Sequence, residues 1–204
     1  MLDVTDLRIA RGDTILFDYL NFSIASGEVV LFEGPNGVGK TTLLRTLAGL
    51  YPHEKGHIHW DCSGETVSLR DSVFFLGHQP GIKQALTVME NMRFYHGDRS
   101  TDTLMQALDE MALSVSLHTR CGQLSAGQQR RVALARLWLS RDAVWILDEP
   151  FTALDREGIA KLTALFERHC EQGGVVLLSS HQPLAYQTQR IKRLRLDAQT
   201  ESQA

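Results

Sequence analysis

The feature that most constrains the fold is a glycine-rich segment between an apolar run and a helical pattern. The segment consists of Gly34, Pro35, Asn36, Gly37, Val38, Gly39, Lys40 and Thr41. The apolar residues 29–32 come directly before it, and residues 42–48 follow with the apolar spacing of a helix. A strand, a glycine-rich turn and a helix in this order make a P-loop, which indicates an α/β fold.

The residue types in this segment suit the binding of phosphate groups. Glycines adopt backbone angles with positive φ, so the turn can direct its N–H groups at an anion, and the helix start adds unpaired donors. Lys40 would place its charge on the β- and γ-phosphates of ATP, and the Thr41 hydroxyl would ligate Mg²⁺. A glycine-rich turn that binds nothing is the alternative, but it leaves the sequence Gly-Lys-Thr-Thr, which ends at Thr42, unexplained.

Size and composition exclude several classes of protein. The chain has 204 residues, enough for one α/β domain with a small insertion, and a formal net charge of -3. It therefore lacks the basic excess of a nucleic-acid-binding protein, and it has no apolar run of about 18 residues that would span a bilayer. The acidic start does not have the layout of a signal peptide. Cys62, Cys121 and Cys170 are odd in number and widely spaced, which favours free thiols in the cytosol.

Alternating and apolar runs predict further strands and helices around the P-loop. We expect strands in the regions 2–9, 15–24, 56–60, 73–76, 144–147, 175–179 and 190–196, with turns at 11–13, 26–28 and 61–64. Helical patterns begin near Thr87, near Thr101 and after Ser125, and another helix follows Asp155. Residues 1–204 are expected to form a single domain, with a core at about 1–81 and 141–197, a helical insertion at about 82–140, and a disordered tail at 198–204.

Polar residues follow several of the expected buried strands. Gln79 comes after residues 73–76, Asp148 and Glu149 come after 144–147, and His181 comes after 175–179. Ligands of open α/β sheets bind beyond the carboxyl ends of the strands, so these side chains are candidates for the site of the P-loop. We expect Asp148 to hold Mg²⁺ and Gln79 to reach the metal or a water. In an extended chain Glu149 would point the opposite way from Asp148, toward a water in line with the γ-phosphate.

The start of the helix after Ser125 is a second candidate phosphate site. Ser125 suits the N-cap position, and Ala126 and Gly127 keep the helix start uncrowded. An ordinary capped helix is the alternative, and it accounts for Ser125 but not for the whole string Leu-Ser-Ala-Gly-Gln that ends at Gln128. His181, for its part, would usually be structural as a lone histidine, but its place beside the other strand-end candidates predicts a γ-phosphate contact.

The histidines also suggest a metal site, with a weaker basis. His57 and His59 would share one face of a strand, and His53 lies close in sequence, but no carboxylate or thiol completes a ligand set. A solvated strand face is the simpler interpretation. The pair His118 and Cys121 is too slight to indicate a haem site, and no Cys-x-x-Cys-His motif occurs.

Taken in order, these motifs resemble those of the ATP-binding subunits of ABC transporters. The resemblance extends over nearly the whole chain: Walker A at residues 34–41, the Q-loop at Gln79, the signature at residues 124–128, Walker B at residues 144–148 followed by Glu149, the D-loop at residues 153–155 and the switch histidine His181. Within that family the strings at 77–83, 124–138 and 145–153 are most similar to the ATPases of haem exporters in cytochrome c maturation.

The resemblance implies an α/β P-loop NTPase domain, with a RecA-like core, an N-terminal antiparallel β-subdomain and an inserted α-helical subdomain. It further implies ATP hydrolysis with Mg²⁺, in which Glu149 polarises the water and Gln79 and His181 sense the γ-phosphate. Two copies would form a homodimer in which Ser125, Gly127 and Gln128 of one copy close on the ATP of the other. Integral membrane subunits would bind this homodimer at the cytoplasmic face of the bacterial inner membrane, and haem itself would be held by partner chains.

Two positions depart from the family pattern. Ala126 stands where the signature usually has glycine, and alanine is small enough to keep the helix start open. Arg11 stands in place of the aromatic side chain that stacks on adenine; a guanidinium can also stack on a base, although a plain surface charge is an equal alternative. A transporter ATPase for another cargo, or a non-transport ABC ATPase in DNA repair or translation, remains the alternative for function.

Overall fold

The computed structural model describes residues 1–61, 73–180 and 191–197. The chain divides into two compact units. The core unit comprises Met1–Phe75, Asp142–Glu149 and Arg168–Ala204, and the helical unit comprises Leu76–Arg141 and Pro150–Glu167. His181, the expected tail at 198–204 and most of the turn expected at 61–64 lie outside the described residues.

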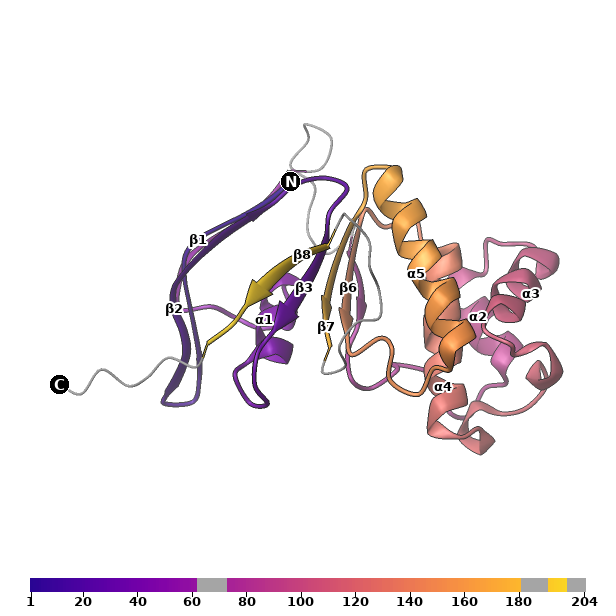
Figure 1. Ribbon diagram of the computed structural model, residues 1–204. Coiled ribbons are helices and arrows are strands. Elements are labelled where there is room, and N and C mark those ends of the chain that lie inside the picture. The colour runs from indigo at the N-terminus through magenta and orange to yellow at the C-terminus, as the bar shows by residue number, and fades with distance from the viewer. Residues whose placement is uncertain (62–72, 181–190, 198–204) are drawn as a thin grey trace. The chain divides into compact units, whose positions relative to one another are not determined.

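An antiparallel sheet opens the core unit (Figure 1). Its strands are β1 (Leu2–Arg11), β2 (Thr14–Ile24) and β4 (Lys55–Trp60), in the order β2-β1-β4. In β1 the expected apolar residues Leu2, Val4, Leu7 and Ile9 are all buried, because they face the hydrophobic core of the unit. His57 and His59 are both exposed on β4, which agrees with a solvated strand face.

The second sheet of the core unit carries the P-loop. It consists of β3 (Val29–Glu33), β5 (Val73–Leu76), β6 (Val144–Asp148), β7 (Val175–Ser179) and β8 (Ile191–Arg195), in the order β5-β6-β7-β3-β8. The pairs β3–β7, β3–β8 and β6–β7 are parallel. All residues of β6 and β7 are buried, as is typical of parallel strands that are covered on both faces. The carboxyl ends of β3, β6 and β7 therefore lie at one edge of the sheet.

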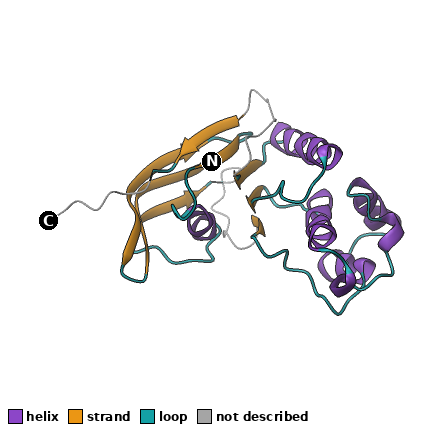
Figure 2. Cartoon of the chain, turned by 60° about the horizontal axis from the view of Figure 1, so that its bottom comes forward, coloured by secondary structure: helices purple, strands orange, loops and turns teal. Residues whose placement is uncertain are grey.

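The helical unit is built mainly from helices (Figure 2), and side chains cap the starts of α2, α3 and α4. Its elements are α2 (Val88–His96), α3 (Thr101–Glu110), η2 (Ser114–Ser116), η3 (Cys121–Gln123), α4 (Ala126–Ala135), η4 (Arg136–Leu139) and most of α5 (Arg156–Glu171). Thr87 and Glu90 form a capping box at α2, which confirms the pattern seen in the sequence. None of the helices in the described ranges is long and apolar enough to cross a bilayer.

The segment 150–167 groups with the helices although it follows a strand of the core in sequence. The rings of Phe151 and Phe166 pack edge to face with their centroids 6.0 Å apart, and both side chains are buried. Leu162 adds to the same apolar face of α5. Aromatic burial thus places the start of α5 in the helical unit, whereas the last residues of the helix belong to the core unit.

Candidate active site

The P-loop joins β3 to α1 (Lys40–Leu47) through a turn that requires glycine. Gly39 is the N-cap of α1 with φ 108°, and a Cβ atom there would lie 2.8 Å from the ring of Phe17. A Cβ atom at Gly34 would lie 2.5 Å from the backbone oxygen of Leu196. Both positions thus exclude larger residues. Among the described residues no side chain caps α1, so its first N–H groups are available to an anion.

Lys40 curls back over this turn. Its Nζ donates hydrogen bonds to the carbonyl oxygens of Gly34 at 2.7 Å and Pro35 at 3.0 Å. Burial lowers the pKa of Lys40, and the nearby carboxylates of Glu149 and Asp148 act in the opposite direction. The ammonium group therefore lies against the carbonyl oxygens at the start of the loop.

Asp148 is the centre of a polar cluster at the end of β6. Its Oδ2 accepts a hydrogen bond from Thr41 Oγ1 at 2.8 Å, and its Oδ1 accepts one from Ser179 Oγ at 2.6 Å. The backbone N–H of Glu149 donates to the same Ser179 hydroxyl at 3.1 Å. Three segments far apart in sequence, at the ends of β6 and β7 and the start of α1, thus converge on one carboxylate.

The backbone at Glu149 differs from the sequence-based expectation. An extended backbone was expected there, and that expectation is wrong. Glu149 has φ 54°, in the left-handed region, and β6 ends at Asp148. In this conformation the N–H of Glu149 donates to Ser179 Oγ at 3.1 Å, at a backbone angle that non-glycine residues adopt only where the surroundings support it.

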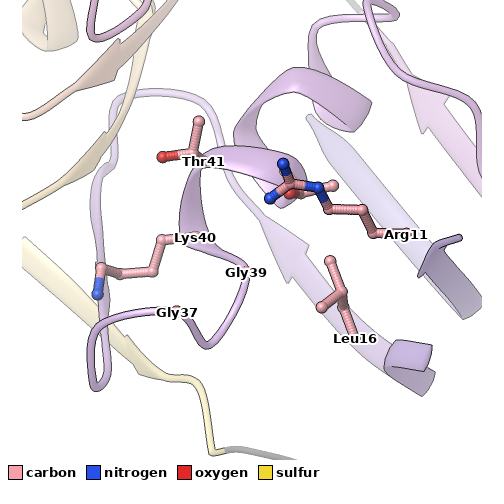
Figure 3. A pocket seen from close by; sticks show the side chains of 7 residues that line it. Arg11, Leu16, Gly37, Gly39, Lys40 and Thr41 are labelled. Carbon is pink, nitrogen blue, oxygen red and sulfur yellow. The ribbon is translucent and has the colours of Figure 1, made fainter. Parts of the chain in front are cut away.

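A hollow in the core unit connects the P-loop to β1 and β2 (Figure 3). Its lining residues are Arg11, Leu16, Gly37, Gly39, Lys40, Thr41 and Thr42. In Figure 3, Arg11 lies on the side of the P-loop opposite to Lys40, with Leu16 below it. Arg11 of β1 therefore lines the same hollow as Lys40, Thr41 and Thr42 at the start of α1.

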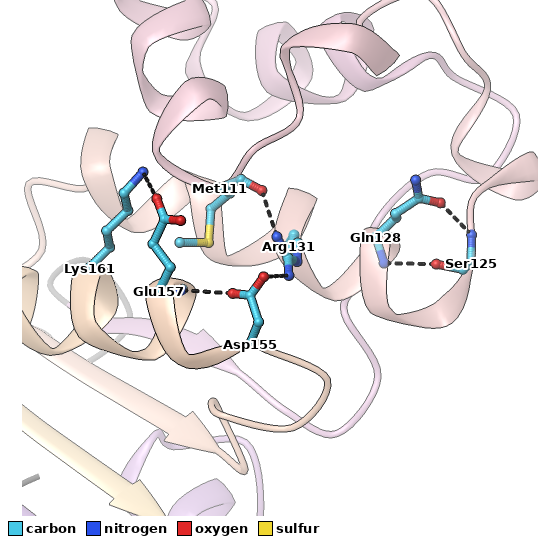
Figure 4. Close-up of polar contacts among 8 residues, drawn as sticks. Met111, Ser125, Gln128, Arg131, Asp155, Glu157 and Lys161 are labelled. Atoms are coloured by element: carbon cyan, nitrogen blue, oxygen red, sulfur yellow. Dashed lines mark hydrogen bonds and ion pairs between the residues drawn. The ribbon is translucent and has the colours of Figure 1, made fainter. Parts of the chain in front are cut away.

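The signature residues form the start of α4 in the helical unit (Figure 4). Ser125 Oγ accepts a hydrogen bond from the N–H of Gln128 at 3.2 Å, and Gln128 Oε1 accepts one from the N–H of Ser125 at 2.9 Å. This capping box confirms Ser125 as the N-cap. Ser125, Gly127 and Gln128 line a hollow together with Arg131 and Ala153.

Arg131, which lines the same hollow, forms an ion pair that the sequence did not indicate. Arg131 on α4 lies 3.1 Å from Asp155, and Asp155 also accepts the N–H of Gly158 at 2.9 Å, which caps α5. The bond from Gly158 lowers the pKa of Asp155, and Arg131 adds to this effect. A Cβ atom at Gly127 would lie 3.3 Å from that of Ala153, so α4 packs closely on the D-loop.

Gln79 belongs to the helical unit, where its side chain is exposed in the segment after β5. Ser179 is the site residue that sequence reasoning missed. A hydroxyl at the end of an otherwise apolar strand, one strand away from Asp148, was the signal that could have identified it.

A family model described as ABC transporter matches residues 17–152, more than half of the chain. The chain belongs to the ABC transporter family. Relatives of this ABC protein include the "cytochrome c biogenesis ATP-binding export protein CcmA" of Tatumella citrea, 45% identical over 98% of this chain and 97% of the relative. The protein of the same name from Vibrio cholerae is 47% identical over 96% and 98%, and that from Escherichia coli K12 is 47% identical over 96% of each chain.

Solved structures agree with this membership. The ABC protein superposes on a putative ABC transporter ATP-binding protein from Pyrococcus furiosus with a TM-score of 0.79, at 28% identity and 96% coverage of both chains. A dimeric ATP-binding cassette bound to ADP and Pi gives a TM-score of 0.78 at 25% identity, with coverage of 98% and 97%. The family resemblance and the expected P-loop NTPase fold class, with its antiparallel β-subdomain and helical subdomain, are confirmed.

Proposed function

We propose that this chain is the ATP-hydrolysing subunit of a membrane ABC complex for cytochrome c biogenesis, where it powers haem export and release of the haem-loaded chaperone. The observation that carries the proposal is the identity of 45–47% to the export proteins of that name over nearly the full length of both chains. The P-loop with buried Lys40 and the cluster around Asp148 supply the chemistry that such a subunit needs.

The arrangement fits ATP with Mg²⁺. The amides of the P-loop and Lys40 would hold the β- and γ-phosphates, and Arg11 would contact the base. Hard cations prefer oxygen ligands, and Thr41 Oγ1 and Asp148 Oδ2, 2.8 Å apart, form such a set, which Gln79 would complete. When bound, Mg²⁺ neutralises charge on the phosphate oxygens.

Glu149 is the proposed general base. Its carboxylate would accept a proton from the water that attacks the γ-phosphate, while Lys40 stabilises the charge that develops on the phosphate oxygens. Gln79 and His181 would contact the γ-phosphate and the water. The N–H of Glu149 donates to Ser179 Oγ, which itself donates to Asp148, so one hydroxyl links the backbone of the proposed base to the proposed Mg²⁺ ligand.

The functional form we propose is a two-fold homodimer with two ATP molecules at its interface. Ser125, Gly127 and Gln128 of each copy would close on the ATP that the other copy holds. The start of α4 supports this role, because Ser125, Gly127 and Gln128 line a hollow at a helix N-terminus, the end of a helix that attracts anions. Integral membrane subunits would bind the homodimer at the cytoplasmic face of the bacterial inner membrane, with the helical subdomain at about 82–140 transmitting the motion. Neither a nucleic acid nor a directly bound haem is part of the proposal.

The test is the set of proteins that co-purify from a detergent extract of bacterial membranes. We expect the tagged chain to recover membrane subunits of cytochrome c maturation, and Lys40→Ala to recover the same subunits without ATP turnover. A strain that lacks the chain should lose covalent haem attachment to c-type cytochromes. Recovery of another transporter's subunits, with normal cytochromes, would assign the ATPase to a different cargo. Haem bound stoichiometrically to the purified chain would contradict the proposal that this chain does not bind haem directly.

A further inference from the structure

The segment that carries Gln79 is held by an arginine of the signature helix. Nη1 of Arg130, on α4, donates hydrogen bonds to the carbonyl oxygens of Gly77 at 2.6 Å and His78 at 3.4 Å. The Arg130 side chain is 6% exposed. Burying a guanidinium is costly unless its donors find acceptors, and two successive carbonyl oxygens accept hydrogen bonds from Nη1 of Arg130.

The far end of the same segment is held as well. The Tyr95 hydroxyl on α2 donates to the carbonyl oxygen of Gly81, and the guanidinium of Arg136 stacks 3.6 Å from the centre of the Tyr95 ring. Asn91, also on α2, accepts the N–H of Lys83 at 2.7 Å and donates to the carbonyl oxygen of Lys83 at 2.9 Å. Residues 77–83, the Gln79 segment, are thus tied to the helical unit at both ends through their backbone.

Arg130 lies on α4, the helix whose first turn is proposed to contact the ATP bound by the other copy. Ser125 caps that helix, and Arg130 follows one and a half turns later on the same rigid element. If α4 moves toward or away from a phosphate at Ser125, Arg130 therefore moves with it and shifts the backbone of the Gln79 segment. The contact is made to backbone carbonyl oxygens, so it acts on the position of the backbone and does not depend on the His78 side chain.

We propose that Arg130 is a positioning residue for ATP hydrolysis: it couples the signature helix, which seals one ATP of the dimer, to Gln79, which serves the other. The inference deepens the proposed function and rests on it. Arg130 touches neither nucleotide; it acts through the orientation of the Gln79 segment. Misplacement of a catalytic group by about 1 Å can cost up to about a hundredfold in rate.

The first test is ATPase kinetics of Arg130→Gln in the complex isolated with its membrane subunits. We expect kcat to fall about tenfold or more, with KM for ATP changed by less than about threefold, because nucleotide binding by the P-loop is unaffected. In a Gln79→Ala background, Arg130→Gln should lower kcat no further, since it acts through Gln79. An unchanged kcat for the single variant, or an equal additional loss in the Gln79→Ala background, would overturn the proposal.

Arg99→Gln is the matched control. Arg99 Nη2 also donates to a backbone carbonyl in the helical unit, that of Leu139 at 3.0 Å, but this contact lies outside the Gln79 segment. We expect its kcat to stay within about twofold of the parent value. An equal loss of kcat in Arg99→Gln would show general weakening of the unit and would also overturn the proposal.

Amide hydrogen exchange gives a readout that needs no ATP turnover. In Arg130→Gln the amides of residues 77–83 should exchange faster, while those of α3 remain at the parent rate. Unchanged exchange in the Gln79 segment would contradict the proposed role of Arg130 in holding that segment. This outcome does not depend on whether the cargo assignment or the ATPase function is right. Where Arg130→Gln does not fold, Tyr95→Phe removes a single donor to Gly81 and should show the same changes at smaller amplitude; no change in either measurement would again overturn the coupling.

Discussion

Ser179 Oγ donates a 2.6 Å hydrogen bond to Asp148 Oδ1, which joins the ends of two adjacent parallel strands, β7 and β6. Both side chains are buried, so the bond forms in surroundings that water does not reach. Thr41 binds the other carboxylate oxygen. The position of the proposed Mg²⁺ ligand is therefore set by two hydroxyl groups of the core unit, one at the end of strand β7 and one in the first turn of helix α1.

Ser179→Ala should leave Asp148 in place but less firmly oriented, because only the hydrogen bond from Thr41 would still hold its carboxylate. Loss of a hydrogen bond to a charged group costs about 1.5–3 kcal/mol. We expect a lower unfolding temperature and a higher Mg²⁺ concentration for half-maximal ATPase activity. A titration of activity with Mg²⁺ at saturating ATP checks this. Ser179→Thr keeps the hydroxyl and serves as the control; an equal Mg²⁺ requirement in all three proteins would contradict the role of this bond.

Lys40→Ala should lose most of the affinity for ATP. The variant removes the charge that faces the phosphates, and charge-assisted hydrogen bonds contribute about 1.5–3 kcal/mol each, which corresponds to at least about tenfold in Kd. Equilibrium binding of a fluorescent ATP analogue measures the change. Unaltered affinity in a folded variant would remove Lys40 from the nucleotide site.

Glu149→Gln should bind ATP and turn it over very slowly. The amide cannot accept the proton of the attacking water, and loss of a general base costs about 10²–10⁴ in rate. Binding and single-turnover hydrolysis are measured on the same preparation. Near-normal hydrolysis would require another residue as the base.

Two substitutions at Ser125 separate its cap from its proposed phosphate contact. Ser125→Ala removes the acceptor for the N–H of Gln128 and should destabilise the protein by about 0.5–2 kcal/mol, whereas asparagine caps helices as well as serine does. Both Ser125→Ala and Ser125→Asn should weaken ATP-induced dimerisation of the Glu149→Gln chain, as measured by gel filtration. Full dimerisation of the Asn variant would leave Ser125 with a capping role alone.

The stability of the core unit should decrease in mild acid because of His169. Its ring stacks on Trp145 with centroids 3.8 Å apart, and its Nε2 lies 3.2 Å from the backbone oxygen of Ala143. Burial lowers the pKa of His169, so the folded state favours the neutral ring. This contribution to stability is present above the unfolded pKa of about 6.5 and is lost as the pH falls below it.

His169→Phe keeps an aromatic ring but does not titrate. We therefore expect its unfolding temperature to fall less between pH 7 and pH 5 than that of the parent chain. Differential scanning fluorimetry at both pH values gives the comparison. Equal decreases in the two proteins would show that His169 does not contribute to the acid sensitivity.

Much of the fold could be predicted because local sequence patterns determine many of its strands, helices and turns. The alternation in residues 2–9, the capping boxes at Thr87 and Ser125, and the glycines before Lys40 each determine their own backbone through contacts within a few residues. The family resemblance followed from the order of these motifs. That residues 150–167 group with the helical unit could not be predicted from the sequence. This grouping depends on the packing of Phe151 against Phe166 of α5, which is a tertiary contact.

By itself the sequence determined where the phosphate loop, the capped signature helix and the strand-end carboxylates lie along the chain. Tertiary structure alone decided which of these groups touch: Ser179 on Asp148, Arg131 on Asp155, and Arg130 on the carbonyl oxygens before Gln79. The physical reason is that glycine φ angles and helix caps depend on near neighbours, whereas a hydrogen bond between segments more than 20 residues apart depends on strand order and helix packing.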